Sequence, residues 1–505
     1  MVRLELERGS GTPLFEQIAS ALRERIMSGL LGEGTPLPPE RDLAKRLGVN
    51  RSTVVKAYGE LKADGFLEAR VGSGTVVSAP PFGAGRGPGR SEPPDWSSLF
   101  RPDPNSFGDL FSGMVASSGK DGVISFATGF PDPGLFPAAD LAEIQRDLLD
   151  GDLRAPLLPS PVEGFGPLRE SLTELMADRG IDVPPREVMA LSGSQQGLDF
   201  AARAFLSPGD TVLAEKFTFF GALEIFRAAG ARVVGIPMDR HGMRTDLLDG
   251  AIRRHNPRFI YTLPTFQNPT GVTMSLERRR ELLETACRHG LPVIEDDPYG
   301  ELRYEGDALP SLKALDRGGC VVYLSSFSKV LFMGLRVGWV SAPMPVVERF
   351  SRIKQMTDLH VNTPAQLLLD RFLREGRYAS HLDRAREAYR RKRDRLAEAL
   401  SRHRSRTGWE WDLPQGGYYI WCGLPDPFPM RAFAARAAEN RVAFLPGQAC
   451  CTDGVSRESH ARLNFTHVPL DQVDEGVRRL ARAVEKAREK GPADEGFVEG
   501  QEPIV

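Results

Sequence analysis

The chain has 505 residues, of which 41% are hydrophobic and 26% charged. These values are typical of a globular protein with a large core, and at about 150 residues per domain the length suggests two to four domains. The net charge of −2 excludes recognition of a polyanion by global charge, so any nucleic-acid site has to be a local cluster of positive side chains.

The N-terminus and the cysteines bear on the cellular compartment. The first residues, "MVRLELERGSG", are charged and lack the apolar stretch of a secretory signal. No uncharged apolar run approaches the roughly 18 residues that a transmembrane helix needs. The sequence therefore predicts a cytoplasmic protein with no membrane association and no metal site. The cysteines form neither a CxxC pair nor a disulfide framework, and free thiols are expected at Cys287, Cys320, Cys422, Cys450 and Cys451.

The composition of the chain changes clearly at one place. The stretch "SAPPFGAGRGPGRSEPPDWSSLFRPDP" is rich in proline and glycine and has almost no apolar periodicity, which is typical of a linker. We therefore predict a small N-terminal domain over residues 1–77, a linker over 78–114, a large domain over 115–488 and a polar tail over 489–505.

The N-terminal segment has the pattern of a winged helix-turn-helix. The stretch "LPPERDLAKRLGVNRSTVVKAYGELKADGFL" predicts two short helices around a turn at Gly48, with Asn50 or Ser52 as the N-cap of the second. After it, "LEARVGSGTVV" predicts a hairpin with its tip at residues 72–74. Before them, an apolar residue at every fourth position predicts an amphipathic helix that Gly29 can end: Leu14, Ile18, Leu22 and Ile26.

This segment resembles the DNA-binding domain of the GntR family of bacterial regulators over nearly its whole length. The matching stretches are "PLFEQIASALRERI", "LPPERDLAKRLGVNRSTV" and "GSGT". A recognition helix presents its N-terminal side chains to base edges, while arginine and hydroxyl groups hold phosphates. The resemblance implies double-stranded DNA as a partner, with the contacts made by Arg41, Arg51, Ser52, Thr53 and Lys56.

A winged helix used only for protein contacts is the alternative. Residues 1–77 hold 11 Lys and Arg against 10 Asp and Glu, a surplus of one. The positive side chains nevertheless cluster on the two helices expected to face the groove, which favours DNA binding: Arg41, Lys45, Arg46, Arg51 and Lys56.

The large segment alternates between two patterns. Short apolar, β-branched runs ("TVLAEKF", "ARVVGIP", "RFIYTLP", "LPVIEDD", "CVVYLSS" and "RVGWVSAP") are separated mostly by helical stretches such as "SLERRRELLETACRHG". This alternation predicts an α/β fold around a largely parallel sheet. Ligands of such sheets bind beyond the carboxyl ends of the strands, so the residues directly after each run are the candidates for a site.

Polar residues follow these runs in a characteristic order. "SGSQQGLD" predicts a helix that begins near Gly193, where free backbone N–H groups favour a phosphate. Each such stretch alone also fits a turn, a helix cap or a solvated lysine, but those explanations do not account for the whole series. The candidates are Ser194 and Gln195, Asn268 in "PTFQNPTG", Asp296 and Tyr299 in "IEDDPYG", Ser326, Ser328 and Lys329 in "SSFSK", Arg336 in "GLRVG" and Arg462 in "ARLNFT".

Together these stretches resemble the fold-type I pyridoxal-phosphate (PLP) aminotransferases, in the branch of the aminoadipate and kynurenine aminotransferases. The resemblance covers roughly residues 120–488 and includes "ISFATGFPDPGLFP" and "GFGPLRESL". It implies a large domain with a mostly parallel sheet, a smaller α+β C-terminal domain and PLP as cofactor.

The resemblance also implies a role for each candidate. Lys329 forms a Schiff base with PLP, and Asp296 pairs with the pyridine nitrogen. Asn268 and Tyr299 hold the phenolic oxygen, and Phe219 stacks on the ring where a tyrosine is usual. The phosphate is held at Ser194, Gln195, Ser326 and Arg336, with Gly193 and Ser328 beside them, and Arg462, with Asn268 beside it, takes the substrate carboxylate.

The chemistry needs these residue types. A carboxylate beside the ring nitrogen keeps it protonated, so that the cofactor can withdraw electrons. The lysine needs a lowered pKa to be nucleophilic near neutral pH, and once displaced it can move a proton. Arginine binds a carboxylate in a bidentate manner. One departure is Pro159, near the place where relatives commonly carry a tyrosine that reaches the phosphate across the dimer.

A GntR-type domain joined by a linker to an aminotransferase-like domain is the architecture of the MocR regulators. This resemblance implies a homodimeric transcriptional regulator that binds promoter DNA and senses an amino acid, an amine or PLP at Lys329. One alternative is an active aminotransferase that transfers an amino group from an amino acid to a 2-oxo acid. Another is a PLP-sensing repressor of vitamin B6 genes. The regulator is favoured over the enzyme.

Overall fold

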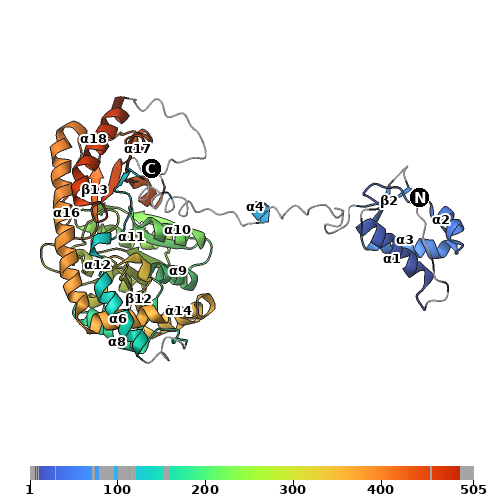
Figure 1. Ribbon diagram of the computed structural model, residues 1–505, viewed down its shortest axis with the longest axis horizontal. Helices are drawn as coiled ribbons and strands as arrows, with labels where there is room; N and C mark the ends of the chain where they lie inside the picture. Colours follow the sequence, from blue (N-terminus) through green and yellow to red (C-terminus); the bar gives the residue numbers. More distant parts are fainter. Residues whose placement is uncertain are drawn as a thin grey trace. The chain divides into compact units, whose positions relative to one another are not determined.

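The chain forms two compact units, Met1–Pro102 and Asp103–Val505 (Figure 1). Gly29, residues 72 and 73 of the predicted hairpin tip, most of the predicted linker and nearly all of the predicted tail lie outside the described residues. Within the described part of the chain, no helix is both long and apolar enough to cross a membrane. The computed structural model describes residues 6, 8, 11–28, 30–70, 74–78, 96–99, 113, 121–151, 159–454 and 458–489.

The first unit is a winged helix-turn-helix, as predicted. Three helices, α1 (Leu14–Met27), α2 (Glu40–Leu47) and α3 (Arg51–Ala63), precede an antiparallel hairpin of β1 (Leu67–Arg70) and β2 (Gly74–Val77). A four-residue helix, α4, follows in the predicted linker at Trp96–Leu99.

A small apolar core holds this first unit together. The predicted stripe of α1 is buried at Ile18, Leu22 and Ile26, against Val54 and Tyr58 of α3. Burying apolar side chains in this way stabilises the unit by roughly 1.5–3 kcal/mol for each large residue.

The turn between α2 and α3 differs from the prediction in one detail. Gly48 ends α2 with φ of 63°, a conformation that glycine adopts without the penalty of a Cβ. Asn50 occupies the N-cap position of α3, as expected, but its side chain makes no capping hydrogen bond.

The second unit is built on a seven-stranded sheet in the order β4-β12-β11-β10-β9-β5-β6. Strand β12 runs antiparallel to both neighbours, and the other pairs are parallel. This confirms the predicted, mostly parallel sheet, although β4 was not among the predicted runs. The strands are β4 (Val188–Leu191), β5 (Thr211–Glu215), β6 (Arg232–Ile236), β9 (Phe259–Thr262), β10 (Val293–Asp296), β11 (Val321–Ser326) and β12 (Gly338–Ser341).

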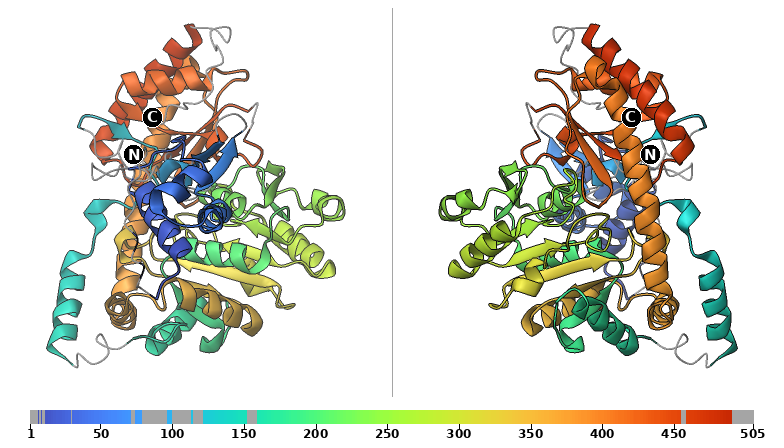
Figure 2. Two further views of the ribbon diagram at one scale, coloured as in Figure 1. Left: turned by 90° about the vertical axis from the view of Figure 1, so that its right-hand side faces the viewer. Right: turned by 90° about the vertical axis from the view of Figure 1, so that its left-hand side faces the viewer.

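Helices cover both faces of this sheet (Figure 2). One core joins Val212, Phe259 and Ile294 to α9 (Ser194–Phe205), α10 (Phe220–Ala228) and α14 (Met344–Thr357). The other joins the alternate strand residues Leu213, Ile260 and Val293 to α11 (Leu248–His255), α12 (Leu276–Arg288) and α13 (Leu312–Leu315). Because both faces are buried, the strands read as continuous apolar runs.

The chain ends in a smaller α+β part, as predicted. An antiparallel sheet of β13 (Tyr419–Gly423), β16 (His460–Asn464) and β15 (Leu445–Pro446) lies beside three helices. The helices are α16 (Arg377–Thr407), which runs along one side of the unit in Figure 1, α17 (Met430–Glu439) and α18 (Val473–Glu489).

Short elements complete the second unit. Strand β3 (Ile124–Ser125) pairs with β14 (Val442–Ala443) and so attaches the beginning of the unit to its C-terminal part. The remaining elements are the helices α6 (Ala138–Asp150), α8 (Gly166–Ala177) and α15 (Thr363–Arg374), and the β7–β8 hairpin (Met238–Asp239 with Gly242–Met243).

Candidate functional site

One cavity of the second unit lies beyond the carboxyl ends of the parallel strands, where ligands of such sheets bind. The loops after β4, β9, β10 and β11 contribute to it, and β16 of the smaller sheet closes it. All residues predicted as catalytic, cofactor-binding or substrate-binding line this cavity: Gly193, Ser194, Gln195, Phe219, Asn268, Asp296, Tyr299, Ser326, Ser328, Lys329, Arg336 and Arg462.

Lys329 lies in the turn after β11 and is held from two directions. Its Nζ donates a hydrogen bond to the carbonyl oxygen of Gly129 at 2.7 Å. Its own carbonyl oxygen accepts a hydrogen bond from the Tyr418 hydroxyl. Burial, together with the nearby positive charge of Arg462, lowers the pKa of Lys329 to about 7, against the opposing effect of Asp296. The amine is therefore available as a neutral nucleophile near neutral pH.

Asp296 is the last residue of β10 and is almost completely buried. Its Oδ2 accepts a hydrogen bond from the Tyr261 hydroxyl at 3.0 Å. Its Oδ1 is buried and has no hydrogen-bond partner among the described residues. Burial raises the pKa of Asp296 to about 7, although the Tyr261 hydrogen bond and Lys329 favour the ionised form. A buried carboxylate oxygen of this kind fits a ligand that brings its own N–H donor.

Backbone and side-chain donors gather where α9 begins. Gly193 precedes the helix with φ of 94°, and a Cβ there would lie 2.5 Å from Nη2 of Arg336. Arg336 donates to the carbonyl oxygen of Ser192 at 2.7 Å, so its guanidinium lies at the helix start. The hydroxyls of Ser326 and Ser328 are 2.8 Å apart beside it. Free N–H groups, an arginine and two hydroxyls are the kinds of donor that suit a phosphate.

Gly338 allows a close approach of the backbone beneath these donors. A Cβ at Gly338 would lie 2.7 Å from the carbonyl oxygen of Ser325 and 2.9 Å from the backbone nitrogen of Ser194. Only glycine therefore allows β12 to pass between β11 and the beginning of α9 at this point.

Arg462 projects from β16 into the cavity and is almost fully buried. It donates to Oδ1 of Asn268 at 2.9 Å and to the carbonyl oxygen of Ala127 at 2.6 Å. Its guanidinium carbon lies 4.2 Å from the centre of the Tyr419 ring. Its Nε lacks a hydrogen-bond partner within the described part of the chain. A buried arginine with an unused N–H fits a carboxylate ligand.

Phe219 lies at the N-cap position of α10 and lines the cavity. A Cβ at Gly221 would lie 2.5 Å from Cζ of this ring, so the glycine makes room for it. The position suits an aromatic wall of the cavity, and stacking on a cofactor ring stays a prediction.

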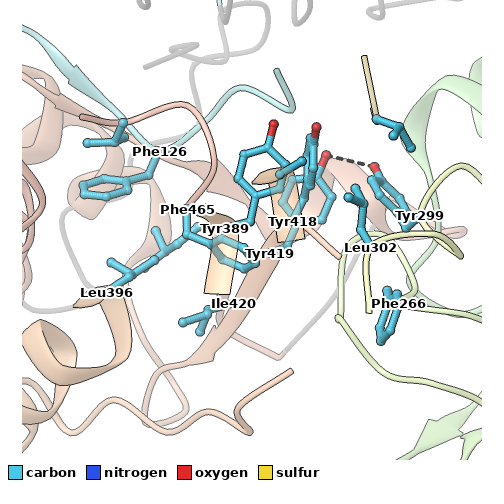
Figure 3. Close-up of a cluster of buried hydrophobic side chains, with 14 of the residues drawn as sticks. Phe126, Phe266, Tyr299, Leu302, Tyr389, Leu396, Tyr418, Tyr419, Ile420 and Phe465 are labelled. Carbon is cyan, nitrogen blue, oxygen red and sulfur yellow. Dashed lines mark hydrogen bonds between the residues drawn. The ribbon is translucent and has the colours of Figure 1, made fainter. Parts of the chain in front are cut away.

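Sequence reasoning missed Tyr419 of β13. Its hydroxyl lies 3.1 Å from the hydroxyl of Tyr299, as the dashed line in Figure 3 shows, within an aromatic cluster that includes Tyr418. Any side chain at Gly129 would collide with the Tyr419 hydroxyl. The stretch "GGYYIW" contains Tyr419, but the sequence alone does not indicate that this side chain faces the cavity. The other lining residues missed are Thr128, Gly129, Phe130, Phe220, Leu263, Pro298 and Met333.

Pro159, the departure noted in the sequence, is exposed and does not line the described cavity. Residues 152–158 before it lie outside the described part of the chain. The loss of a tyrosine contact to the phosphate therefore stays a prediction.

The predicted DNA contacts lie on α2 and at the beginning of α3. Arg41, Arg51, Ser52 and Lys56 are exposed, and Thr53 is half-buried. The Arg51 guanidinium lies 3.6 Å from the carboxylate of Glu40. The Nζ of Lys56 lies 3.5 Å from the centre of the Phe15 ring on α1. Arg41 is therefore the arginine of this set with the fewest internal contacts, since the described part of the unit gives it no ion pair.

Comparison with known families assigns both units. Residues 14–77 match the bacterial regulatory proteins of the gntR family. Residues 121–480 match the class I and II aminotransferases.

Individual relatives match along most of the chain. The uncharacterised HTH-type transcriptional regulator YisV of Bacillus subtilis (strain 168) is 32% identical and covers 95% of this chain and 97% of its own. The probable rhizopine catabolism regulatory protein MocR of Rhizobium meliloti is 33% identical over 79% of this chain and 80% of its own.

A solved structure resembles the second unit. The α-aminoadipate aminotransferase LysN of Thermus thermophilus, complexed with N-(5′-phosphopyridoxyl)-L-leucine, is 35% identical. It superimposes with a TM-score of 0.72 over 78% of this chain and 99% of its own.

Proposed function

Because this chain belongs to the MocR-type regulators, with a GntR winged helix followed by a class I and II aminotransferase domain, we propose that it regulates transcription in response to an amine-bearing ligand at Lys329. The observation that carries this conclusion is the presence of both units in one chain, with a regulator relative matching along 95% of it.

The aminotransferase-like unit is of the PLP-dependent class. When bound, PLP supplies an aldehyde carried on an electron-withdrawing ring, and amines react with that aldehyde. We propose that Oδ1 of Asp296 accepts a hydrogen bond from the ring nitrogen, which gives that buried oxygen the partner it lacks. The start of α9, Arg336 and the Ser326–Ser328 hydroxyls would hold the phosphate.

Lys329 and Arg462 would handle the ligand. The neutral Nζ of Lys329 can attack a carbonyl carbon and can afterwards accept or donate a proton, because its pKa is lowered to about 7. The N–H groups of Arg462 would bind a carboxylate of the ligand and orient its amine toward Lys329. The ligand class that fits both groups is an amino acid.

Regulation needs two conformations that bind DNA differently, and the ligand has to prefer one of them. A homodimer, which we propose, would place two winged helices on one operator. Two apolar side chains, one in the last turn of α14 and one just after it, are exposed and would be available to a dimer interface: Met356 is 77% and Leu359 is 61% exposed.

An active aminotransferase is the second candidate, and the presence of Arg462 and Lys329 in one cavity favours it. The purified full-length protein should be mixed with a panel of amino acids and amines and a 2-oxo acid acceptor, while cofactor absorbance, product and operator affinity are followed. The regulator is expected to show a spectral change without sustained turnover, and the same compound should alter operator affinity. Sustained turnover with one favoured substrate and unchanged DNA binding would identify an enzyme instead.

Arg41→Ala and Arg51→Ala are each expected to weaken operator binding about 10-fold, because a lost side-chain contact to DNA is worth roughly 1–3 kcal/mol. If a contact is to phosphate, the salt dependence should also decrease by about one released ion. Fluorescence anisotropy with labelled operator at several salt concentrations measures both quantities. Lys62→Ala, an exposed cation near the other end of α3, is the matched control.

The cofactor spectrum should stay unchanged in all three variants, since these residues lie outside the second unit. Wild-type affinity in both arginine variants would rule out the face formed by α2 and the beginning of α3.

A further inference from the structure

Two cysteines of the second unit lie together away from the cavity. Cys287 belongs to the last turn of α12 and is exposed, and Cys320 directly precedes β11 and is partly buried. Their Sγ atoms are 2.8 Å apart, although the residues are separated by 33 positions. A disulfide bond is about 2.05 Å long, so a shift of less than about 1 Å would join them.

The loop before β11 holds Cys320 in place. The carboxylate of Asp316 accepts hydrogen bonds from the backbone N–H groups of Gly318 at 3.0 Å, Cys320 at 3.3 Å and Val321 at 2.8 Å. A Cβ at Gly318 would lie only 2.9 Å from Sγ of Cys287. The glycine therefore leaves the space in which the Cys287 sulfur approaches its partner.

We propose that Cys287 and Cys320 form a reversible disulfide by exchange with a low-molecular-weight disulfide. The Cys287 thiolate attacks one sulfur of that compound, whose S–S bond breaks and releases one thiolate. The Cys320 thiolate then attacks Sγ of Cys287 and releases the second thiolate, and the two protons lost by the cysteines are taken up by the two released thiolates. The protein thiols are oxidised by two electrons and the small disulfide is reduced by two.

The exposure of the two cysteines indicates which of them attacks the small disulfide first. Cys287 is the exposed sulfur and so is accessible to a small disulfide. Burial and the neighbouring Cys287 and Asp316 raise the pKa of Cys320, which disfavours it as the first attacker. In the second step its target, Sγ of Cys287, is already adjacent. The other three cysteines, Cys422, Cys450 and Cys451, are buried.

A metal site is the competing explanation of this cluster. The ligand atoms of Cys287, Cys320 and Asp316 all lie within 4.8 Å of one another. Structural zinc sites use four ligands, and within the described residues no fourth His, Cys, Asp or Glu joins this group. The Asp316 oxygens also accept hydrogen bonds from three backbone N–H groups. These observations favour the disulfide.

The bond would join the end of α12 to the beginning of β11, whereas Lys329 follows the other end of that strand. It would close a loop across 33 positions and restrict the unfolded chain. We therefore expect oxidation to raise the unfolding temperature by a few degrees and to leave the cofactor absorbance unchanged.

The test uses the full-length protein with its cofactor, incubated with oxidised glutathione or with dithiothreitol. Remaining thiols are alkylated, and the peptides are mapped by mass spectrometry. Oxidised protein is expected to lose two alkylation sites and to yield one Cys287–Cys320 cross-linked peptide, which dithiothreitol reverses. Cys320→Ser should instead retain glutathione on Cys287 and show no rise in unfolding temperature. Cys422→Ala, which keeps both thiols, should behave as the wild type.

The wild-type peptide map decides the matter even if a variant folds poorly. Full alkylation of both cysteines after oxidation would overturn the proposal, and so would glutathione that persists on Cys287 of the wild type. Protection of both thiols that a chelator reverses and dithiothreitol does not would identify a metal site instead.

Discussion

Lys329→Ala is expected to abolish the covalent link between the protein and PLP. Lys329 is the lysine that lines the described cavity, and its lowered pKa makes it the nucleophile there. Borohydride treatment followed by mass spectrometry should attach the cofactor to wild-type protein at Lys329 and leave the variant unlabelled. The visible absorbance of the wild type should also be missing from the variant.

The lowered pKa of Lys329 predicts that the rate of cofactor attachment depends on pH. Because the pKa of Lys329 is lowered to about 7, the neutral amine dominates above that pH and the protonated form below it. Cofactor attachment to cofactor-free protein should therefore accelerate as the pH rises through about 7, and stopped-flow absorbance can follow it. Lys486→Ala, an exposed lysine on α18, is the control and should keep wild-type rates.

If borohydride treatment attaches the cofactor to the Lys329→Ala protein as well, another lysine carries the cofactor.

Asp296→Asn is expected to weaken PLP binding about 10- to 100-fold, because a hydrogen bond to a charged group contributes roughly 1.5–3 kcal/mol. The amide has no charge with which to keep the ring nitrogen protonated. The Tyr261 hydroxyl can still donate to the new side chain, so the change is confined to charge. Equilibrium dialysis of PLP and the rate of amine-dependent spectral change measure the effect.

The unfolding temperature of Asp296→Asn shows whether weaker PLP binding comes from the lost charge or from misfolding. The pKa of Asp296 is raised to about 7, so its stabilising contribution is lost as the pH rises through about 7, where the buried carboxylate ionises. Asp296→Asn avoids that ionisation, and without cofactor it should unfold at the wild-type temperature or above it at pH 8. Asp182→Asn, an exposed carboxylate, is the control. Wild-type PLP affinity in Asp296→Asn would place the partner of the ring nitrogen elsewhere.

Local patterns in the sequence were sufficient for much of the fold. The stripe of Ile18, Leu22 and Ile26 predicted α1 because helical periodicity is visible in neighbouring residues. The six apolar runs predicted β5, β6 and β9 to β12, since strands buried on both faces are apolar throughout. Strand β4 was not predicted, because its four residues, "VMAL", are too few to distinguish a strand from a buried helix.

The part of the candidate site that could be predicted consists of residues that directly follow the strands. The carboxyl ends of parallel strands meet at one edge, so Asp296 and Lys329 were expected at the same site. The resemblance supplied their roles and brought in Arg462. Tyr419 could not be found in this way, because its place in the cavity depends on how the smaller sheet packs against Tyr299.

By itself the sequence determined which elements form and which chemical groups stand at their ends, because both depend on residues close together in the chain. Only the tertiary structure decided which distant groups meet. The hydrogen bond of Arg462 to Asn268 spans 194 positions, and the contact of Cys287 with Cys320 spans 33. The physical reason is that such contacts depend on how separate elements pack, as when β12 inserts between β4 and β11, and no local pattern specifies which elements become neighbours.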